Sequence, residues 1–186
     1  TQHHRAIYDT RATADVLIKL LEEVYFKGIK YHDDINSLIT NDIIHRIAIP
    51  KHITLLAQTR LGLKNMYKIL SDASTNRFYR GPRALRSVIE KFRTDILIGS
   101  SCVNGEVFDA AINKDFETLR DVAQFYDYLE VQPPLVYSHL AQGNSDRFSS
   151  YILDAIKRIV LVGEELGKPV CATSDAHHIY KNQVDY

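Results

Sequence analysis

The chain has 186 residues, 45% of them hydrophobic and 25% charged, which is typical of a globular protein. Its 23 Lys and Arg balance its 23 Asp and Glu, so no overall positive charge indicates a nucleic-acid partner, although a local basic patch would be enough for one. The only cysteines, Cys102 and Cys171, lie in apolar surroundings, which argues against a disulfide scaffold and favours a reducing compartment. No apolar run is long enough to span a membrane, and no signal peptide is visible.

The N-terminal region predicts one long helix. Apolar residues recur at helical spacing, so we expect an amphipathic helix from about Ala6 to Phe26 that ends at Gly28. In a helical segment His4 and Asp9 could share a side, but taken alone they are ordinary polar residues of a surface helix. The polar stretch that follows reads as a linker, in which His32 and His45 are surface or packing histidines.

From His52 onward, strand-like and helix-like segments alternate. Strands are predicted at 52–57, 95–100, 128–132 and 170–173, and helices at 63–70, 82–92, 107–112, 116–126 and 149–166. This order predicts an α/β fold with a parallel sheet. About four strands are too few to close a barrel, so either the sheet is open or the rest of a barrel lies outside the chain. The first residue is Thr1 and the last, Tyr186, closely follows a polar cluster, so we expect a piece of a larger protein.

Polar residues follow two of the predicted strands. The apolar run 170–173 reads as a buried strand, and Asp175 and His177 come directly after it, two residues apart and facing the same way on extended backbone. Such a pair is a plausible half-site for a divalent metal, or else a polar loop. Cys102 follows the strand at 95–100 and is either a thiolate ligand or a small buried apolar residue. Cys171 fits the buried alternative.

Three further features allow a functional or a structural interpretation. Glu130 lies within an apolar strand and needs a partner, for which a structural hydrogen bond is favoured over catalysis. His52 begins its strand instead of ending it, which makes it the weaker ligand candidate on geometry alone. A basic and aromatic cluster suits phosphate contact and base stacking, or equally a solvated loop. Its members are Arg77, Tyr79, Arg80 and Arg83.

Several stretches resemble the polymerase-and-histidinol-phosphatase (PHP) domain of bacterial replicative polymerases. These are 51–67 (KHITLLAQTRLGLKNMY), 97–106 (LIGSSCVNGE), 125–134 (FYDYLEVQPP) and the final Thr-Ser-Asp-Ala-His of 173–177. The resemblance is closest to the PolC-type DNA polymerase III alpha subunit, in which a proofreading 3′–5′ exonuclease is inserted within the PHP domain. The stretch 3–9 (HHRAIYD) resembles the last motif of a DEDD-type exonuclease. The implied fold is part of a PHP-type (β/α) barrel with parallel strands, preceded by the terminal helix of an exonuclease domain.

The resemblance implies roles for particular residues. His4 matches the exonuclease general base, and Asp9 matches a carboxylate that holds one of two Mg or Mn ions. Four positions match the PHP metal cluster, which would bind Zn, Mn or Fe. These positions are His52, Cys102, Asp175 and His177.

Some features of the family pattern are missing. The opening His-x-His ligands, a further His and Glu, and the other exonuclease carboxylates have no counterpart in the chain. Neither active site can therefore be complete, and we expect this fragment alone to be inactive. Ser174 and His178 stand where the family usually has Gly and an aromatic residue, so His178 could be a spare ligand.

The predicted organisation is an exonuclease helix at 1–30, a linker at 31–50 and the C-terminal part of a PHP domain at 51–186. The parent protein would be a cytoplasmic DNA-directed DNA polymerase with proofreading activity. It would act on DNA and deoxynucleoside triphosphates, with replisome subunits such as the sliding clamp as partners and no membrane attachment. The alternatives are a free-standing metal-dependent phosphoesterase and a structural PHP module that braces the polymerase core.

Overall fold

The computed structural model describes residues 6–40, 42–140, 145–174 and 176, with the side chains of His139 and residues 145–149 left aside. The chain forms two compact units, residues 1–48 and residues 49–186. Among the described residues, no helix is both long enough and apolar enough to cross a membrane.

The first unit is built on one long helix. Helix α1 spans Ala6–Phe26, as the sequence predicted. It ends in a Schellman motif at Gly28, whose φ of 85° suits glycine; the Gly28 amide donates to Tyr25 O at 2.9 Å and the Ile29 amide to Val24 O at 3.3 Å. The predicted linker is not structureless, because it contains the 3-10 helix η1 (His32–Leu38) and the short helix α2 (Ile44–Ile47).

The apolar stripe of α1 is exposed. None of its residues is buried, and Val16 and Leu20 keep 58% and 53% of their surface accessible. His45, in contrast to the apolar residues of α1, is buried. Only 6% of its surface is exposed, which makes it a packing histidine.

Among its described residues, the second unit contains four short strands. They are β1 (Thr54–Ala57), β2 (Ile96–Gly99), β3 (Leu129–Val131) and β4 (Val170–Ala172). Strands β3 and β4 are parallel, and a parallel bridge between Gly99 and Tyr128 links β2 to β3. Strands β1 and β2 are antiparallel, so the prediction of parallel strands was wrong for this pair. The described strands form two two-stranded sheets and do not close a barrel.

The connection between β1 and β2 explains their orientation. Helix α3 (Arg60–Thr75) leaves the end of β1, and the chain then turns so that the Arg83 amide donates to Ala73 O. Residues 84–95, which include α4 (Arg86–Lys91), run back to the start of α3, where the Gln58 amide donates to Asp95 O at 2.9 Å. A single crossover helix would have given parallel strands. Here the chain runs out along α3 and returns along residues 84–95, so β2 begins where β1 ends.

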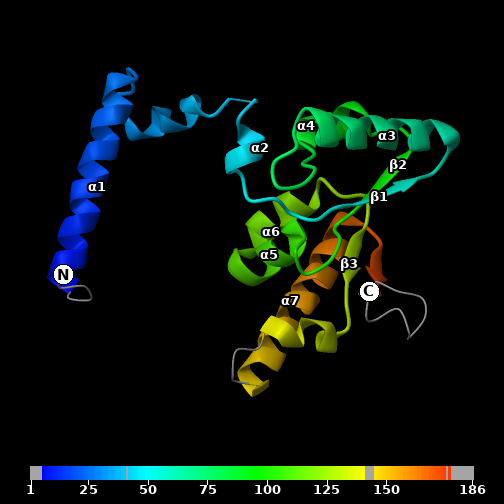
Figure 1. Ribbon diagram of the computed structural model, residues 1–186. Helices are drawn as coiled ribbons and strands as arrows, with labels where there is room; N and C mark the ends of the chain where they lie inside the picture. The colour runs from blue at the N-terminus through cyan, green and yellow to red at the C-terminus, as the bar shows by residue number, and fades with distance from the viewer. Residues whose placement is uncertain (1–5, 41, 141–144, 175, 177–186) are drawn as a thin grey trace, which may run out of the picture. The chain divides into compact units, whose positions relative to one another are not determined.

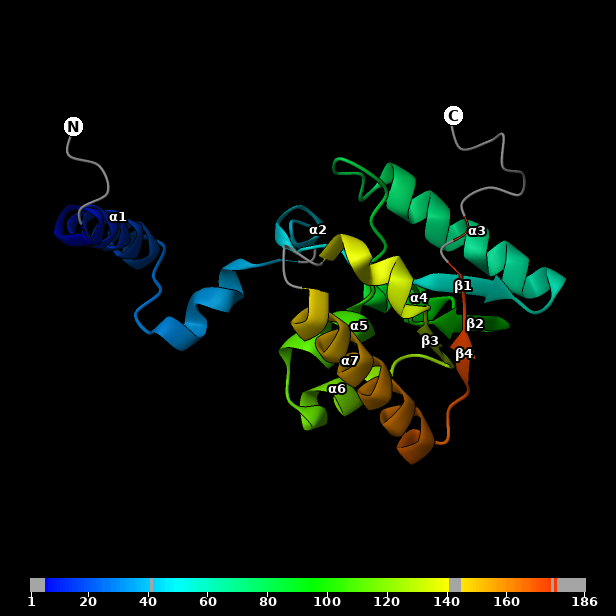
Figure 2. The same cartoon turned by 90° about the horizontal axis from the view of Figure 1, so that it is seen from below.

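The remaining helices pack around the other strands. They are α5 (Glu106–Asn113), α6 (Phe116–Ala123), the 3-10 helix η2 (Pro134–Leu140) and α7 (Ser145–Leu166). Helices α5, α6 and α7 pack on one another, α7 also contacts β3 and β4, and α3 covers β1 and β2 (Figures 1 and 2). Helix α4 starts later than predicted, α3 is longer, and η2 was not predicted.

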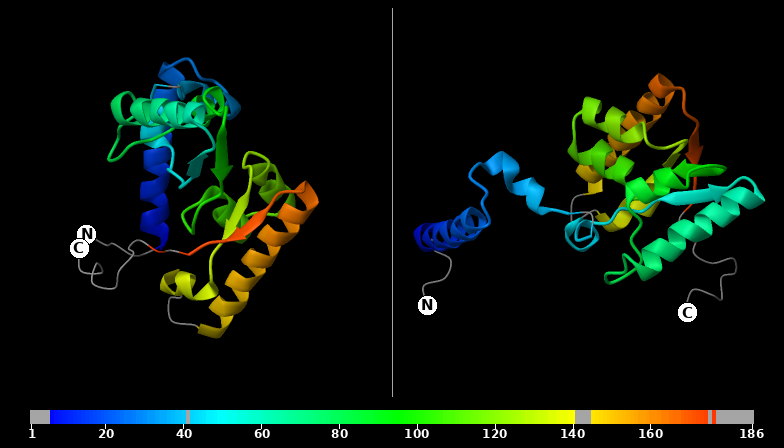
Figure 3. Two further views of the ribbon diagram at one scale, coloured as in Figure 1. Left: turned by 90° about the vertical axis from the view of Figure 1, so that its right-hand side faces the viewer. Right: turned by 90° about the horizontal axis from the view of Figure 1, so that it is seen from above.

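Strand β4 is less buried than the sequence predicted. Val170 is half-buried, whereas Cys171 and Ala172 are exposed, so the prediction of Cys171 as a small buried residue was wrong. The cause is its position at the edge of the described sheet, where β3 is its only described strand neighbour and α7 covers one side (Figure 3). A short apolar run does not reveal whether both faces of its strand are covered.

Two adjacent residues of β2 provide a matched test of this packing. Ile98 is 0% exposed and Leu97 is 36% exposed, because neighbouring strand residues point to opposite faces. We expect Ile98→Ala to lower the free energy of opening of β2 by about 2–5 kcal/mol, since it leaves a cavity in the core. Leu97→Ala should cost less than about 1 kcal/mol. Amide hydrogen exchange at β2 in the full-length protein measures both, and equal effects would contradict the burial described here.

Candidate metal centre and basic groove

His52 and Cys102 form a close pair of potential metal ligands. The His52 Nδ1 and Cys102 Sγ atoms lie 3.3 Å apart, although the residues are 50 positions apart in the sequence. His52 is exposed and Cys102 is half-buried. The antiparallel pairing explains the contact, because it puts the start of β1 beside the end of β2. The sequence makes His52 the weaker ligand candidate because it begins its strand, but this inference holds only for parallel strands.

Hydrogen bonds involving His52, Gly105 and Glu130 hold the loop that carries Cys102. The His52 amide donates to Asn104 O at 3.0 Å, and the Gly105 amide closes the turn on Cys102 O at 2.8 Å. A Cβ atom at Gly105 would lie 2.2 Å from Ser100 O, so a side chain there would force the turn open.

Glu130 is the third support of this loop. Ser101 has a φ of 63°, an uncommon conformation for a residue other than glycine, and its amide donates to Glu130 Oε1 at 3.0 Å. The Glu130 amide in turn donates to Ser100 Oγ at 2.7 Å. The prediction that Glu130 has a structural hydrogen-bond partner is therefore confirmed.

Tyr128 and Gly99 surround the Glu130 carboxylate. Burial, and then the negative charge of Glu130, raise the pKa of Tyr128 to about 12. A Cβ atom at Gly99 would lie 2.4 Å from the Tyr128 hydroxyl oxygen and 2.5 Å from Glu130 Oε1. Glycine at this position leaves room for both side chains behind the Cys102 loop.

The geometry of the His52–Cys102 pair fits a metal ion. Zinc bonds of about 2.3 Å to sulfur and about 2.1 Å to nitrogen, at angles of 90–109°, separate the two ligand atoms by about 3.1–3.6 Å. The observed 3.3 Å lies within that interval, and in this structure the two atoms form a hydrogen bond with each other. Imidazole and thiolate together are also a ligand pair that zinc favours.

Asp175 and His177, the other predicted ligands, lie outside the described residues, as do His4 and His178. Strand β4 ends at Ala172, which pairs with Val131, so the carboxyl ends of β3 and β4 share one edge. Strand β2 runs in the same direction as β3, and its last residue, Gly99, bridges to Tyr128 at the start of β3. Within the described part of the chain, no three His, Cys, Asp or Glu side chains gather into a potential metal site. Asp9 is exposed in the first turn of α1.

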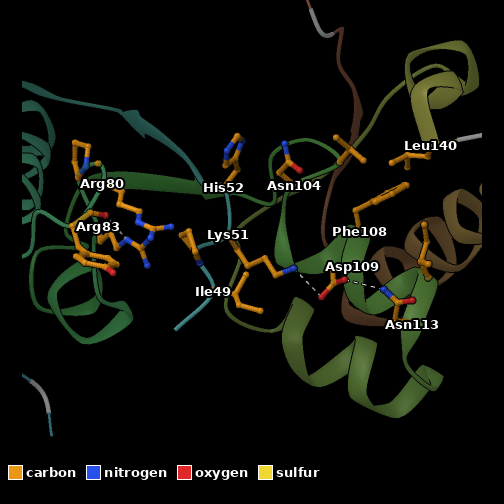
Figure 4. Close-up of a pocket in the computed structure, with 16 residues that line it drawn as sticks. Ile49, Lys51, His52, Arg80, Arg83, Asn104, Phe108, Asp109, Asn113 and Leu140 are labelled. Atoms are coloured by element: carbon orange, nitrogen blue, oxygen red, sulfur yellow. Dashed lines mark hydrogen bonds and ion pairs between the residues drawn. The ribbon is translucent and has the colours of Figure 1, made fainter. Parts of the chain in front are cut away.

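A groove of about 740 Å³ passes His52 and is lined entirely by the second unit. Figure 4 shows His52 and Asn104 at its middle, Arg80 and Arg83 at one end, and Asn113 and Leu140 at the other. We call this feature the basic groove. It is lined by Ile49, Pro50, Lys51, His52, Tyr79, Arg80, Gly81, Pro82, Arg83, Val103, Asn104, Phe108, Asp109, Ile112, Asn113 and Leu140.

The structure divides the predicted basic and aromatic cluster. Tyr79, Arg80 and Arg83 line the basic groove. Arg77 is not among the lining residues, and its Nε atom pairs with Asp72 Oδ2 at 2.9 Å. Hydrogen bonds from Asn76 and Arg77 hold the pKa of Asp72 below its ordinary value, so this ion pair persists at neutral pH.

Lys51 and Asp109 are groove residues that sequence reasoning missed. Lys51 Nζ lies 3.0 Å from Asp109 Oδ2, and Asn113 Nδ2 donates to Asp109 Oδ1 at 2.9 Å. These contacts hold the pKa of the Asp109 carboxyl below its ordinary value. No signal in the sequence marks the pair, because Asp109 reads as an ordinary residue of the first turn of a helix.

Comparison with known proteins adds a family match and close relatives. The family profile described as "PHP domain" matches residues 4–131. "DNA polymerase III PolC-type" of Bacillus subtilis (strain 168) is 47% identical over 179 residues, covering 96% of this chain and 12% of that protein. The protein of the same name from Oceanobacillus iheyensis is 42% identical over 186 residues, covering 100% of this chain and 13% of that protein. The chain thus spans 12–13% of the length of these relatives.

Proposed function

The chain belongs to the PHP domain family, and from this premise we propose that it is a segment of a PolC-type replicative DNA polymerase and supplies part of a divalent-metal site to it. The identity to proteins named "DNA polymerase III PolC-type" extends over nearly the whole chain and supports this assignment. In the parent protein, DNA and deoxynucleoside triphosphates would be the substrates, other replisome subunits such as the sliding clamp the partners, and the cytoplasm the compartment.

The observation that carries the proposal of a metal site is the 3.3 Å approach of His52 Nδ1 and Cys102 Sγ. His52, Cys102, Asp175 and His177 would hold a Zn, Mn or Fe ion between the Cys102 loop, which follows β2, and the carboxyl end of β4. A metal ion bound there would polarise a phosphoryl oxygen and lower the pKa of a bound water. Glu130 keeps the Cys102 loop in place through the Ser101 amide.

The proposed exonuclease contribution rests on sequence resemblance. His4 would take the proton of the attacking water, and Asp9 would hold one of two Mg or Mn ions. The family match begins at residue 4 and so includes α1. Assignment of residues 1–30 to an exonuclease domain, 31–50 to a linker and 51–186 to a PHP domain therefore depends on the motif at 3–9 and needs its own test.

Metal content of the full-length protein tests the metal site. We expect Asp175→Asn combined with His177→Ala to lower the bound zinc, manganese or iron by more than half, while primer extension continues. Elemental analysis after dialysis against metal-free buffer gives the metal content, and a primer-extension assay controls for folding. Unchanged metal content would leave 173–177 as a polar loop and would favour the structural module that braces the polymerase core.

A further inference from the structure

One short segment, residues 125–127, is attached to both ends of the Cys102 loop (residues 100–105). At the end that follows β2, the Ile98 amide donates to Asp127 Oδ2 at 2.7 Å, and the Asp127 amide donates to Ile98 O at 2.8 Å. These two hydrogen bonds hold the strand that leads into the loop.

At the other end of the loop, polar contacts converge on Glu106, the first residue of α5. The Tyr126 hydroxyl donates to Glu106 Oε2 at 3.1 Å, and Arg86 Nη2 donates to the same oxygen at 2.5 Å. The guanidinium carbon of Arg86 also lies 4.2 Å from the centre of the Phe125 ring, which is within cation–π range. We call Arg86, Glu106 and Tyr126 the Glu106 cluster.

Burial makes the tyrosine the better shielded partner in the Glu106 cluster. Only 3% of Tyr126 is exposed. Burial, and then the negative charge of Glu106, raise the pKa of Tyr126, so its hydroxyl keeps its proton at neutral pH and can donate it to the carboxylate. The side chains of Arg86 and Glu106 are 46% and 35% exposed, so water weakens their ion pair. Loss of the tyrosine hydroxyl should therefore disturb Glu106 at least as much as loss of the arginine charge.

A tight turn connects Glu106 to Cys102. Gly105, the N-terminal cap of α5, donates its amide to Cys102 O at 2.8 Å. Ser100 O lies only 2.2 Å from the position that a Cβ atom would take at Gly105, so this turn is closely packed. A shift of Glu106 would therefore move the Cys102 backbone, and with it the Sγ atom that lies 3.3 Å from His52 Nδ1.

We propose that Tyr126 and Arg86 are positioning residues of the metal centre, which fix Glu106 at the start of α5 and thereby hold the Cys102 thiolate in place for the ion. This role rests on the proposed metal site and adds to it two residues that act through the backbone of the Cys102 loop. Groups that bond directly to a metal ligand typically change metal affinity by about 10–100-fold when they are replaced. Because Tyr126 and Arg86 act one step further away, we expect a smaller effect.

A double-variant cycle on the full-length protein tests this role. Tyr126→Phe removes only the hydroxyl group and should lower metal affinity by about three- to tenfold, measured by competition with a chromophoric chelator. In a Cys102→Ser background the same change should have no further effect, because Tyr126 acts through the Cys102 thiolate. Saturating cobalt gives a second readout, since the thiolate charge-transfer band should weaken in the Tyr126→Phe protein.

Arg86→Gln is a second variant that removes the other partner of Glu106. Because the Arg86 side chain is 46% exposed, the change should leave the fold intact, and primer extension checks this. Metal affinity should fall in the same direction as with Tyr126→Phe.

Tyr151→Phe is the matched control. Its hydroxyl donates to Ile112 O at 2.9 Å, near the C-terminal end of α5, so it contacts the same helix at the end remote from Cys102. It should leave both the metal affinity and the cobalt band unchanged.

The outcomes separate the positioning role from the metal site itself. If Cys102→Ser lowers metal affinity but Tyr126→Phe and Arg86→Gln do not, the metal site stands and the positioning role is wrong. An equal effect of Tyr126→Phe with and without Cys102, or an equal loss in Tyr151→Phe, would also overturn it, because the effect would then be one of general stability. If Cys102→Ser itself leaves metal affinity unchanged, the metal site fails, and the positioning role fails with it.

Discussion

Replacing Cys102 with Ser should lower metal affinity of the full-length protein at least tenfold. The thiolate contributes charge and a strong bond to zinc, whereas the serine hydroxyl contributes neither at neutral pH. Because Cys102 Sγ lies 3.3 Å from His52 Nδ1, its loss also leaves the imidazole without a second ligand in the described part of the site. Competition with a chromophoric chelator measures the affinity.

Cys171→Ser is the control for this substitution. Cys171 is also a free thiol, and it lies exposed within β4. Its replacement should leave metal affinity unchanged. Cobalt gives a second readout, because a bound thiolate produces a charge-transfer absorption band that should vanish in the Cys102 variant alone. Equal affinities of the two variants would show that the His52–Cys102 contact is structural.

Replacing Asp9 with Asn should reduce 3′–5′ degradation of a mismatched primer at least a hundredfold while primer extension continues. The expected loss is large because a carboxylate that binds a catalytic metal cannot be replaced by a neutral amide. His4→Ala should act similarly through loss of the general base, an effect of about 10²–10⁴-fold. Single-turnover degradation of a primer with a mismatched end measures both rates.

Asp15→Asn is the matched control for Asp9→Asn. Asp15 is an exposed carboxylate on the same helix, and the same charge is removed. It should leave degradation unchanged. If Asp9→Asn also leaves degradation unchanged, residues 1–30 are not part of an exonuclease site. The match of the PHP profile from residue 4 would then describe α1 better.

Helical periodicity made the helices the more predictable part of this fold. The bounds of α1 followed from its apolar spacing and Gly28, which occupies the left-handed conformation at the helix end. The solvent exposure of its apolar stripe could not be predicted in this way, because periodicity identifies an apolar face but not the partner that covers it. For the same reason, the run at 170–173 predicted a strand correctly and its burial wrongly.

The main error of the sequence-based prediction was the direction of β1 relative to β2, and this error affects the candidate metal site. Alternation of strands and helices favours parallel pairs, but residues 84–95 return the chain to the end of β1 and make β2 antiparallel to it. Local patterns do not contain this long-range return. The resemblance to the family therefore identifies His52 as a candidate ligand where local sequence geometry does not, and the antiparallel pairing of β1 with β2 is the physical reason for its position. The Lys51–Asp109 pair escaped prediction because its partners come from separate elements.

The most direct test of the proposed metal centre is X-ray absorption at the zinc edge of the full-length, zinc-loaded protein. Our interpretation predicts one sulfur at about 2.3 Å together with nitrogen and oxygen ligands at about 2.0–2.2 Å. The sulfur contribution should disappear in the Cys102→Ser protein and persist in the Cys171→Ser protein. A coordination shell of nitrogen and oxygen alone in the unaltered protein would contradict a metal site built on His52 and Cys102.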